Sequence, residues 1–294
     1  MKVVGVDIGG TQIKMAAFSR EGILLGKWTR ATFDAPGQCH PPKFAQMVRD
    51  MLGEIVPVAD CIGIAAPGVA AGDGRSIAFM PGQLHGIETF DWTTFLDRKE
   101  IVPVLNDAHA ALLGEVWLGA ATGCRDVVLI TLGTGVGGAI LSDGQLLKGA
   151  IGRAGHLGHV SISDDGERSI TGTPGALEPA IGNYTVARRS HGRFSSTREL
   201  VEAHLAGDAG ASEIWLTSVR ALARAITSFI NLLDPEIILI GGGIAQAGKA
   251  LFQPLSAMLD QMEWRPAGHR ARIVPTQLGE WAGAYGAAWN SLNL

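Results

Sequence analysis

Two neighbouring stretches in the middle of the chain combine residue types that suit phosphate chemistry. The apolar run at residues 101–105 ends in Asn106-Asp107, and the apolar run at residues 127–132 ends in a glycine-rich turn at residues 133–138. A carboxylate at a strand end can act as a general base, and the backbone N–H groups of a glycine turn can bind phosphate oxygens. The two stretches therefore indicate a site that handles phosphate.

Glycine turns also follow apolar runs at residues 9–11 and 241–243. None of the turns has the spacing of a Walker A motif or of a GxGxxG motif that opens a helix, which disfavours a P-loop or a Rossmann dinucleotide site. The segments VVGVDIGGT (residues 3–11) and VVLITLGTG (residues 127–135) form a weak internal repeat. Such a repeat predicts a duplicated α/β fold with a cleft between its halves, in which ligands bind at the carboxyl ends of strands.

Hydrophobic periodicity gives the elements that position these turns. The predicted domains are residues 1–118 and residues 119–294, and the terminal helix is free in this scheme to pack back on the first domain. Strands are predicted at residues 3–7, 13–18, 23–29, 61–65, 101–105, 127–132, 139–141, 145–147, 160–162, 236–240 and 272–275. Helices are predicted at residues 44–56, 108–118, 197–206, 214–233, 249–262 and 281–292, and loops at residues 32–42, 72–92, 149–159 and 164–182.

The composition narrows the class of protein. Hydrophobic residues make up 47% of the 294 residues and the formal charge is −4, so the chain can bury a large core and has no basic surplus for nucleic acid. Cys39, Cys61 and Cys124 are too few and too scattered for a disulfide framework or a four-cysteine zinc site. Without a signal-peptide pattern or an apolar run of roughly 20 residues, we expect a cytoplasmic protein that does not engage membranes.

Six motifs then identify a resemblance. VGVDIGGTQIK, IAAPG, NDAHAALLGE, LGTGVGGAI, AGHLGH and IGGGI, in this order and across essentially the whole chain, resemble the ROK family of sugar kinases. The resemblance implies the actin-like, hexokinase-like (ribonuclease H-like) ATPase fold, ATP and Mg²⁺ as cofactors, and a homodimer. ROK repressors carry a helix-turn-helix before the first strand. Here the first strand begins at Val3, so we expect a kinase.

The resemblance also assigns roles to individual residues. Asp107 would be the general base for the attacking sugar hydroxyl, and Asn106 would hold a sugar hydroxyl. The alternative for this pair is an N-cap of the helix that follows. Asp7 would lie near Mg²⁺ and bind it indirectly, while Lys14 is either a phosphate contact or a solvated strand residue. The predicted ATP contacts are Gly9, Gly10, Thr11, Gly133, Thr134, Gly135, Gly242 and Gly243.

Departures from the family pattern fall in the sugar site. The family usually has Glu-x-Gly-His, with a zinc-binding His, whereas this chain has His156-Leu157-Gly158-His159, a change that also resembles bacterial N-acetylmannosamine kinases. A cysteine-rich zinc motif is reduced to residues 171–178 without cysteines, so no structural zinc is expected. The predicted sugar-site residues are Gly68, Gln83 (for a missing Asn), Asn106, His156, His159 and Glu178.

The predicted function is ATP-dependent phosphorylation of the 6-hydroxyl of a hexose or N-acetylhexosamine, with N-acetylmannosamine or glucose favoured. A fructokinase is the alternative of the same class. A kinase-inactive sugar sensor or regulatory protein of the same fold is the alternative of a different class. The altered sugar motif keeps that alternative open, while Asp107 and the complete glycine turns count against it.

Overall fold

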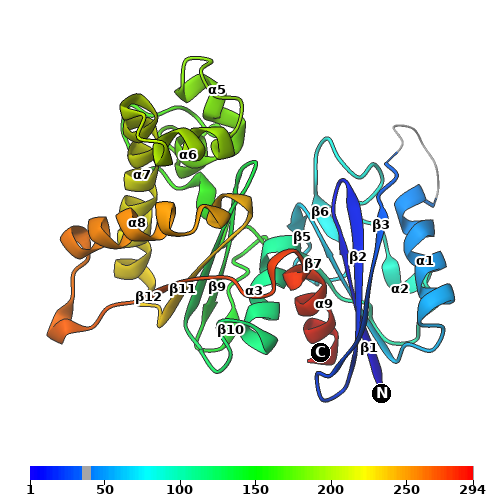
Figure 1. Cartoon of the computed structure of the whole chain (residues 1–294). Coiled ribbons are helices and arrows are strands. Elements are labelled where there is room, and N and C mark those ends of the chain that lie inside the picture. Colours follow the sequence, from blue (N-terminus) through cyan, green and yellow to red (C-terminus); the bar gives the residue numbers. More distant parts are fainter. Residues whose placement is uncertain (35–40, 294) are drawn as a thin grey trace. The chain divides into compact units, whose positions relative to one another are not determined.

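The computed structural model describes residues 1–34 and 41–293, so Cys39 and the middle of the loop predicted at residues 32–42 lie outside the described residues. A first five-stranded sheet has the order β3-β2-β1-β4-β7 (Figure 1). Strand β1 is antiparallel to β2 and parallel to β4, which is in turn parallel to β7. The strands are β1 (Lys2–Ile8), β2 (Gln12–Ser19), β3 (Leu24–Ala31), β4 (Cys61–Ala66) and β7 (Val104–Asn106).

A second five-stranded sheet repeats this pattern with the order β10-β9-β8-β11-β12. Strand β8 is antiparallel to β9 and parallel to β11, which is parallel to β12. The strands are β8 (Val127–Leu132), β9 (Val136–Ser142), β10 (Gln145–Leu146), β11 (Ile237–Gly241) and β12 (Arg272–Pro275). Because the two sheets share their strand order, and β8, β9, β11 and β12 run in the same relative directions as β1, β2, β4 and β7, the duplicated α/β fold predicted from the internal repeat is confirmed.

The chain forms two compact units, which are described separately below. Unit 1 comprises Met1–Gly123, Leu146–Ala154 and Gln277–Leu294. Unit 2 comprises Cys124–Gln145 and Gly155–Thr276. No helix among the described residues is long and apolar enough to span a membrane.

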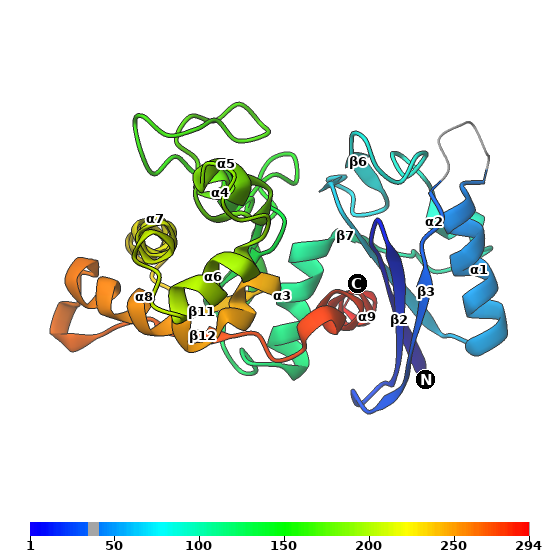
Figure 2. The ribbon, with the colours of Figure 1, turned by 45° about the horizontal axis from the view of Figure 1, so that its top comes forward.

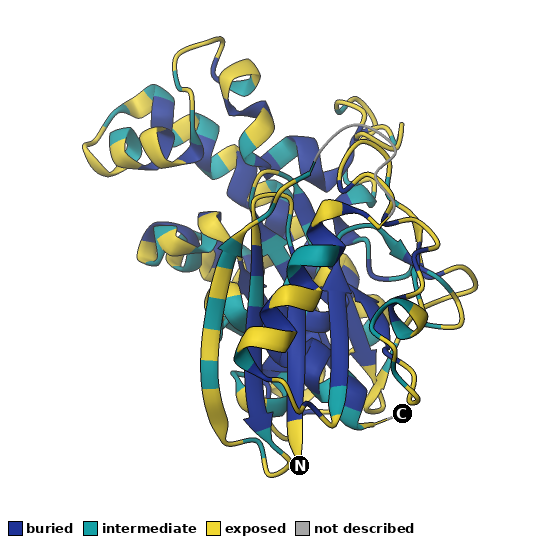
Figure 3. Ribbon diagram, turned by 90° about the vertical axis from the view of Figure 1, so that its right-hand side faces the viewer, coloured by how far each residue is buried: buried dark blue, intermediate teal, exposed yellow. Residues whose placement is uncertain are grey.

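Helices cover both faces of the sheet in unit 1. Alternate residues of a strand point to opposite faces, and here both sets are apolar. Val4 and Val6 pack with helix α1 (Lys43–Ile55), whereas Val3 packs with helix α9 (Ala282–Leu292). Strands β1, β2, β4 and β7 are accordingly buried along most of their length, whereas the edge strand β3 is not, and α1 exposes its outer side (Figure 3).

Helix α9 approaches its neighbours so closely that only glycine fits at the contacts. A Cβ atom built on Gly5 of β1 would lie 1.8 Å from the Ala284 carbonyl oxygen, and one on Gly63 of β4 would lie 1.9 Å from that of Ala287. On the other side of the helix, a Cβ on Gly286 would lie 1.6 Å from the carbonyl oxygen of Ala110 in α3 (Asp107–Leu118). Figures 1 and 2 show α9 beside α3. The small residues of α9 therefore fix its position against β1, β4 and α3.

A buried carboxylate, Glu115, secures the chain where it enters α9. Glu115 lies on α3 and is fully buried. Its two oxygens accept hydrogen bonds from the backbone N–H groups of Ala120 at 2.8 Å, Gln277 at 2.9 Å and Leu278 at 2.8 Å. Hydrogen bonds to an ionised group are among the stronger ones in proteins. Glu115 thus holds together two segments that are distant in sequence.

The core of unit 2 lies between the second sheet and its helices. Trp215 of α7 (Ala209–Leu233) is fully buried among apolar residues of β8, β11 and α8 (Lys249–Met262), and its Nε1 donates to the Ala250 carbonyl at 2.9 Å. The other helices of this unit are α4 (Leu177–Ile181), α5 (Val186–Arg189) and α6 (Thr197–Leu205).

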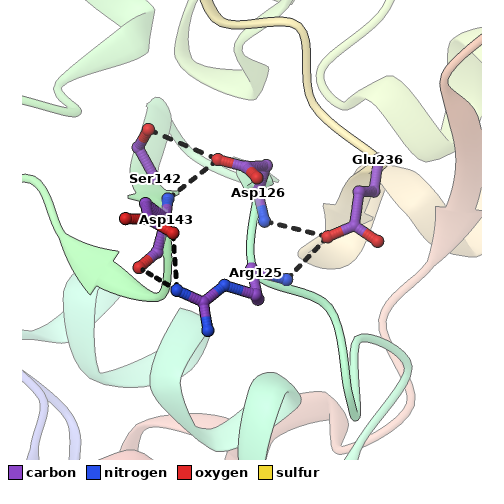
Figure 4. Close-up of polar contacts among 5 residues, drawn as sticks. All are labelled: Arg125, Asp126, Ser142, Asp143 and Glu236. Carbon is purple, nitrogen blue, oxygen red and sulfur yellow. Dashed lines mark hydrogen bonds and ion pairs between the residues drawn. The ribbon is translucent and has the colours of Figure 1, made fainter.

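A polar cluster ties together three strands at the end of this sheet opposite the glycine turns (Figure 4). Glu236, just before β11, accepts N–H bonds from Arg125 at 2.7 Å and Asp126 at 3.1 Å, just before β8. Asp126 in turn accepts from the Asp143 N–H at 2.8 Å, in the β9–β10 turn, and Arg125 Nη2 pairs with Asp143 Oδ1 at 2.5 Å. These bonds fix the start of β8 and β11, whose other ends carry the predicted phosphate turns.

The structure corrects several predicted boundaries. Strand β7 begins at Val104 and not at residue 101, and β9 begins at Val136, so the glycine turn predicted at residues 133–138 spans only residues 133–135. Val136 pairs with Leu132, which brings Gly137 and Gly138 into the sheet. The predicted loop at residues 164–182 contains α4, and α7 starts at Ala209, five residues earlier than predicted. Residues 160–162 form only an isolated bridge.

Short elements complete the described fold. Strands β5 (Val69–Ala70) and β6 (Ile77–Phe79) and helix α2 (Trp92–Phe95) interrupt the loop predicted at residues 72–92 and its flanks. The 3₁₀ turns are η1 (Leu157–His159), η2 (Asn183–Thr185), η3 (Gly243–Ala247), η4 (Pro266–Gly268) and η5 (Gly279–Trp281).

Candidate active site

The carboxyl ends of β1, β4 and β7 bring two carboxylates of unit 1 near each other. Asp7 lies level with Ala65 of β4, which lies level with Leu105 of β7, and Asp107 follows two residues later. Burial, and next the charge of Asp107, raise the pKa of Asp7 to about 7, while Lys14 acts in the opposite direction. A carboxyl group with such a pKa gains strongly from a cation nearby. We call Asp7 and Asp107 the carboxylate edge.

Lys14 lies directly across from Asp7 in the β1–β2 pair. Its ammonium group is 3.1 Å from Glu280, and its side chain is only 17% exposed. Lys14 is therefore partly buried and paired with Glu280, and its phosphate contact stays a prediction. A Cβ on Gly283 would lie 2.6 Å from Asp7 Oδ2, so the Asp7 carboxylate lies against the first turn of α9. The positive end of the helix dipole favours a carboxylate there.

Asn106 and Asp107 take different positions. Asn106 is the N-cap of α3: its Oδ1 accepts from the N–H groups of Ala108 at 2.9 Å and His109 at 3.2 Å, and its Nδ2 donates to the Gly68 carbonyl at 2.9 Å. The capping alternative is thus correct for Asn106. Asp107 is the first residue of α3 and is exposed, with Oδ1 accepting from the Ala108 N–H at 2.8 Å. Capping by Asn106 leaves the Asp107 carboxylate at the surface.

Two hydrogen bonds at Gly9 fix the backbone of the first glycine turn. Gly9 donates to the Gln12 carbonyl at 2.9 Å, and the Thr32 hydroxyl donates to the Gly9 carbonyl at 2.6 Å, while Gly10 and Thr11 are exposed. A Cβ on Gly10 would lie 3.0 Å from Gln83 Oε1, so Gln83 lies against this turn. Unit 1 therefore brings Gln83, predicted at the sugar, next to a turn predicted at the phosphates.

In unit 2, a short antiparallel pairing of two backbone segments brings His159 close to Glu178. The Val160 carbonyl accepts from the Leu177 N–H at 3.0 Å, Ser161 bridges Ala176, and the Ile162 N–H donates to the Gly175 carbonyl at 2.8 Å. His159 comes just before the first of these segments and Glu178 just after the second. Backbone pairing thus brings together two predicted sugar-site residues that are 19 positions apart.

Both side chains carry buried polar atoms without a partner among the described residues, namely His159 Nδ1 and Glu178 Oε1. Burial lowers the pKa of His159, with Glu178 opposing and His156 adding to the shift. The rings of His156 and His159 are stacked with centroids 6.5 Å apart. Unsatisfied buried polar atoms are costly and rare, so this cluster suits a ligand with many hydroxyl or amide groups.

The second glycine turn is built around Glu178. Its Oε2 accepts from the Val136 N–H at 3.0 Å, and a Cβ on Gly135 would lie only 2.4 Å from the same oxygen. The N–H groups of Asn183 and Tyr184 donate to the carbonyls of Gly133 and Thr134, at 3.0 Å and 3.1 Å. The Gly133 N–H donates to the Gly135 carbonyl at 2.9 Å, so these bonds fix the backbone of the turn.

Gly242 closes the third turn at the end of β11. Its φ is +86°, and a Cβ there would lie 2.3 Å from the Leu132 carbonyl oxygen, so only glycine is accommodated. The second and third turns therefore lie side by side at the ends of the adjacent parallel strands β8 and β11. We call residues 133–135 and 241–243 the glycine edge.

A cavity of about 540 Å³ opens beside the glycine edge. Its walls combine the two turns, η3 and one side of α6, with both apolar and polar side chains. The lining residues are Gly133, Thr134, Asn183, Ser196, Thr197, Arg198, Val201, Glu202, Leu205, Gly243, Ile244, Gln246 and Ala247. All of them belong to unit 2.

Within residues 1–34 and 41–293, no group of three or more His, Cys, Asp or Glu side chains is placed to hold a metal ion. Asp7 and Asp107 are two carboxylates, so a metal at the carboxylate edge would need further ligands from water or substrate, as Mg²⁺ commonly uses.

Comparisons with known proteins agree with this geometry. The ROK family model matches residues 3–292. A glucokinase from Thermotoga maritima is 33% identical over 98% of this chain and 96% of the relative, and an N-acetylmannosamine kinase from Vibrio cholerae is 32% identical over 84% and 85%. The crystal structure of a ROK family glucokinase from Streptomyces griseus in complex with glucose and AMPPNP superposes with a TM-score of 0.77, 26% identity and full coverage of both chains.

The chain therefore belongs to the ROK family and is a sugar kinase with the actin-like, hexokinase-like fold. The family resemblance stated from the motifs is confirmed.

Several residues of the site had no distinct signal in the sequence. Asn183 and Thr197 are polar residues in turn-rich stretches, and the helical period of α6 predicts a helix without indicating what it lines. His109, whose Nε2 is 3.0 Å from the Ala154 carbonyl, lies inside a motif but was not predicted to have a role. The cap signal Ser196-x-x-Glu199 was the only feature that pointed to this helix terminus.

Proposed function

We propose that this protein transfers the γ-phosphoryl group of ATP to the 6-hydroxyl of a hexose or N-acetylhexosamine, with Asp107 as the general base. The observation that carries the proposal is the exposed carboxylate of Asp107 at the end of β7, close enough to raise the pKa of Asp7 at the end of β1. Phosphoryl transfer needs positioning, charge stabilisation and a base for the attacking hydroxyl. The carboxylate edge supplies the base and a place for a cation.

Each unit offers polar groups that could bind the sugar. His156, His159 and Glu178 form one set, in which two buried polar atoms lack partners among the described residues. Asn106 has a second amide hydrogen beyond the one given to Gly68, so it can position the substrate while capping α3. Gly68 and Gln83 complete the proposed sugar contacts.

The phosphate groups of ATP would be held by backbone N–H groups and hydroxyls of the glycine turns. The proposed contacts are Gly9, Gly10, Thr11, Gly133, Thr134, Gly135, Gly242 and Gly243, with Lys14 as a further phosphate contact. The cavity beside Gly133, Thr134 and Gly243 has room for a nucleoside, which fits ATP as the donor. Mg²⁺, held indirectly by Asp7, would neutralise the charge that develops on the transferred phosphoryl group.

The fit of Mg²⁺ rests on the electrostatics of the carboxylate edge. Burial and Asp107 hold the pKa of Asp7 near 7, which means that its ionised form lacks sufficient compensation from Lys14 alone. A hydrated divalent cation supplies that compensation. Asp7 would thereby orient the metal, and Asp107 would remain available to the sugar hydroxyl.

Glucose and N-acetylmannosamine are the favoured substrates. Support comes from the two relatives, one a glucokinase and the other an N-acetylmannosamine kinase. His156, which replaces the usual carboxylate, can donate as well as accept a hydrogen bond and so suits an acetamido carbonyl. The proposal also includes a homodimer, no structural zinc, and domains at residues 1–118 and 119–294.

The test is a coupled assay of ADP release over a panel of sugars that includes glucose, mannose, fructose, N-acetylglucosamine and N-acetylmannosamine. Turnover with glucose or N-acetylmannosamine, and a 6-phosphate product by NMR, is expected. If no hexose or N-acetylhexosamine is turned over while one of them still raises the Tm, the protein is a sugar-binding protein and the kinase proposal fails.

A further inference from the structure

One side of helix α6 lines the cavity of unit 2 and changes from polar to apolar along the helix. Thr197, Val201 and Leu205 all line it and follow each other at intervals of four residues, so they share one side of the helix. The face is polar at Thr197 and apolar at the other two positions, and it extends about 12 Å along the helix axis. Leu205, at the far end, is 68% exposed, which places the mouth of the cavity there.

The polar end of this face is tied to the second glycine turn. The Thr197 N–H donates to Asn183 Oδ1 at 2.7 Å, and the Asn183 N–H donates to the Gly133 carbonyl at 3.0 Å. Two hydrogen bonds therefore set the distance between the α6 terminus and the turn that would hold phosphate. Anything that extends from those phosphates into the cavity passes Thr197 first and then reaches Val201 and Leu205.

Thr197 also carries a hydroxyl without a use inside the protein. The residue is 5% exposed, and its Oγ1 has no hydrogen-bond partner among the described residues. By contrast, the buried Thr185 of the same unit is satisfied, because its hydroxyl donates to the Pro179 carbonyl at 2.8 Å. A helical threonine has two accessible χ1 wells, so one rotation can turn the hydroxyl toward the cavity. A buried hydroxyl left unpaired destabilises the fold, which points to a ligand that satisfies it.

We propose that Thr197 binds a ribose hydroxyl of the nucleoside triphosphate and so favours ribonucleotides over deoxyribonucleotides. The inference rests on the proposed function, because it takes the glycine edge as the phosphate site. The ribose is the part of a nucleotide next to the phosphates and carries hydroxyls that can donate to and accept from Oγ1. The base then lies along Val201 and Leu205 on one side and Ile244 and Ala247 on the other.

The test compares the Thr197→Val and Thr197→Ser variants by calorimetric titration with ADP, 2′-deoxy-ADP and 3′-deoxy-ADP, without sugar. Wild type should bind one of the deoxy analogues roughly 3- to 10-fold more weakly than ADP. Thr197→Val should bind ADP as weakly as wild type binds that analogue, and it should no longer distinguish the two. Thr197→Ser should retain the preference of wild type.

A second readout separates this role from a structural one. Since the hydroxyl has no partner among the described residues, Thr197→Val should raise the Tm of the ligand-free protein by roughly 1 to 4 °C. The same substitution should lower the affinity for ADP. Thr227→Val is the matched control: its hydroxyl donates to the Ala223 carbonyl at 2.9 Å within α7, so ADP binding should not change.

Two results would overturn the inference. One is a wild type that binds ADP and both deoxy analogues equally well, and the other is a Thr197→Val variant with unchanged ADP affinity or a lower Tm. Turnover in the sugar panel decides the proposed function separately. If ADP binding depends on Thr197 but no sugar is turned over, the kinase proposal is rejected and the role of Thr197 in nucleotide binding stands.

Discussion

The two sheets have the same strand order but place different chemistry at equivalent strand ends. In the repeat, Asp7 of β1 corresponds to Thr131 of β8, and the turn at residues 9–11 corresponds to that at residues 133–135. The carboxylate edge of unit 1 holds two acidic groups, of which Asp107 helps to raise the pKa of Asp7. The glycine edge of unit 2 has no acidic group at the matching position, and the carboxylate of Glu178 beside it accepts a hydrogen bond from the Val136 N–H.

This difference shows how a duplicated fold can divide a reaction between its copies. Backbone direction and strand order fix where a ligand can bind, and they are the same in both sheets. The side chains at those places decide what is done there. Acidic groups favour cations and proton transfer, whereas N–H groups and small residues favour phosphate oxygens. Each of the following experiments changes one side of this comparison.

The largest effect should come from Asp107→Asn. Removing the proposed general base should lower kcat by roughly 10²- to 10⁴-fold with little change in sugar affinity, because the amide keeps the size and the hydrogen-bonding reach of the carboxylate. Steady-state kinetics and calorimetry with the best sugar of the panel would measure the two quantities. Activity within tenfold of wild type would remove Asp107 as the base.

Asp7→Asn tests the other acidic group of the carboxylate edge. The folded pKa of Asp7, about 7, lies above its ordinary value of 3.8, so ionising it costs stability as the pH rises from about 4 to 7 and costs a constant amount above that. The free energy of unfolding of the variant should therefore exceed that of wild type by on the order of 4 kcal/mol at pH 8, with no difference near pH 3.5. Added Mg²⁺ should also no longer change the free energy of unfolding of this variant.

Urea unfolding at several pH values measures this gain. Asp107→Asn provides the comparison, since it removes only the like charge and should give a smaller gain over the same pH interval. A gain for Asp7→Asn that does not depend on pH would show that burial of the ionised group is not its cause.

On the glycine edge, Gly135→Ala should have a smaller effect than either carboxylate substitution. The new Cβ would meet Glu178 Oε2 at 2.4 Å, so the carboxylate must move and lose its bond to the Val136 N–H. We expect sugar affinity to fall by roughly tenfold and stability by about 1 to 3 kcal/mol.

Gly133→Ala is the matched control, because a Cβ at Gly133 has no neighbour within 4 Å. Its stability and sugar affinity should stay close to those of wild type. Gly10→Ala, at the corresponding turn of unit 1, meets only the end of the Gln83 side chain and should also be tolerated. Equal losses in Gly135→Ala and Gly133→Ala would contradict the role given to Glu178.

The smallest effect should come from Glu236→Gln at the far end of the second sheet. Bonds from the Arg125 and Asp126 N–H groups hold the pKa of Glu236 below its ordinary value of 4.5, so its contribution exists above that pH and disappears as the pH falls further. The carboxylate is solvent-exposed, so we expect a loss in the free energy of unfolding below about 1 kcal/mol at pH 7, a smaller loss as the pH falls below 4.5, and unchanged kcat.

Much of this fold could be predicted from sequence because its strands are long, apolar and bounded by glycine. The strands beginning at Val3 and Val127 and the helix after Asn106 have clear periods, and the repeat predicted their duplication. Helix α4 was missed because five residues are too short to show a period. Val136–Gly138 was assigned to a loop because glycine is rare in strands, yet pairing with β8 overrides that preference.

The site was predictable where a motif carried it and not where contacts between distant segments form it. Asp7, Asp107 and the glycine turns are adjacent to strands and could be named from the chain alone. Thr197 becomes a candidate only through Asn183, which links it to Gly133, and no local pattern predicts such a link. The ion pair of Lys14 with Glu280, 266 positions away, likewise has no local signal in the sequence.

The glycine contacts of α9 set an order of assembly during protein synthesis. Gly5, Gly63 and Gly114 belong to the first part of the chain that the ribosome releases, but the helix that covers them is made only after all of unit 2. Until then, one face of the first sheet is bare, whereas unit 2 already has every strand and helix it needs. The second half of the chain can therefore fold before the first half is finished, the reverse of the usual order of translation.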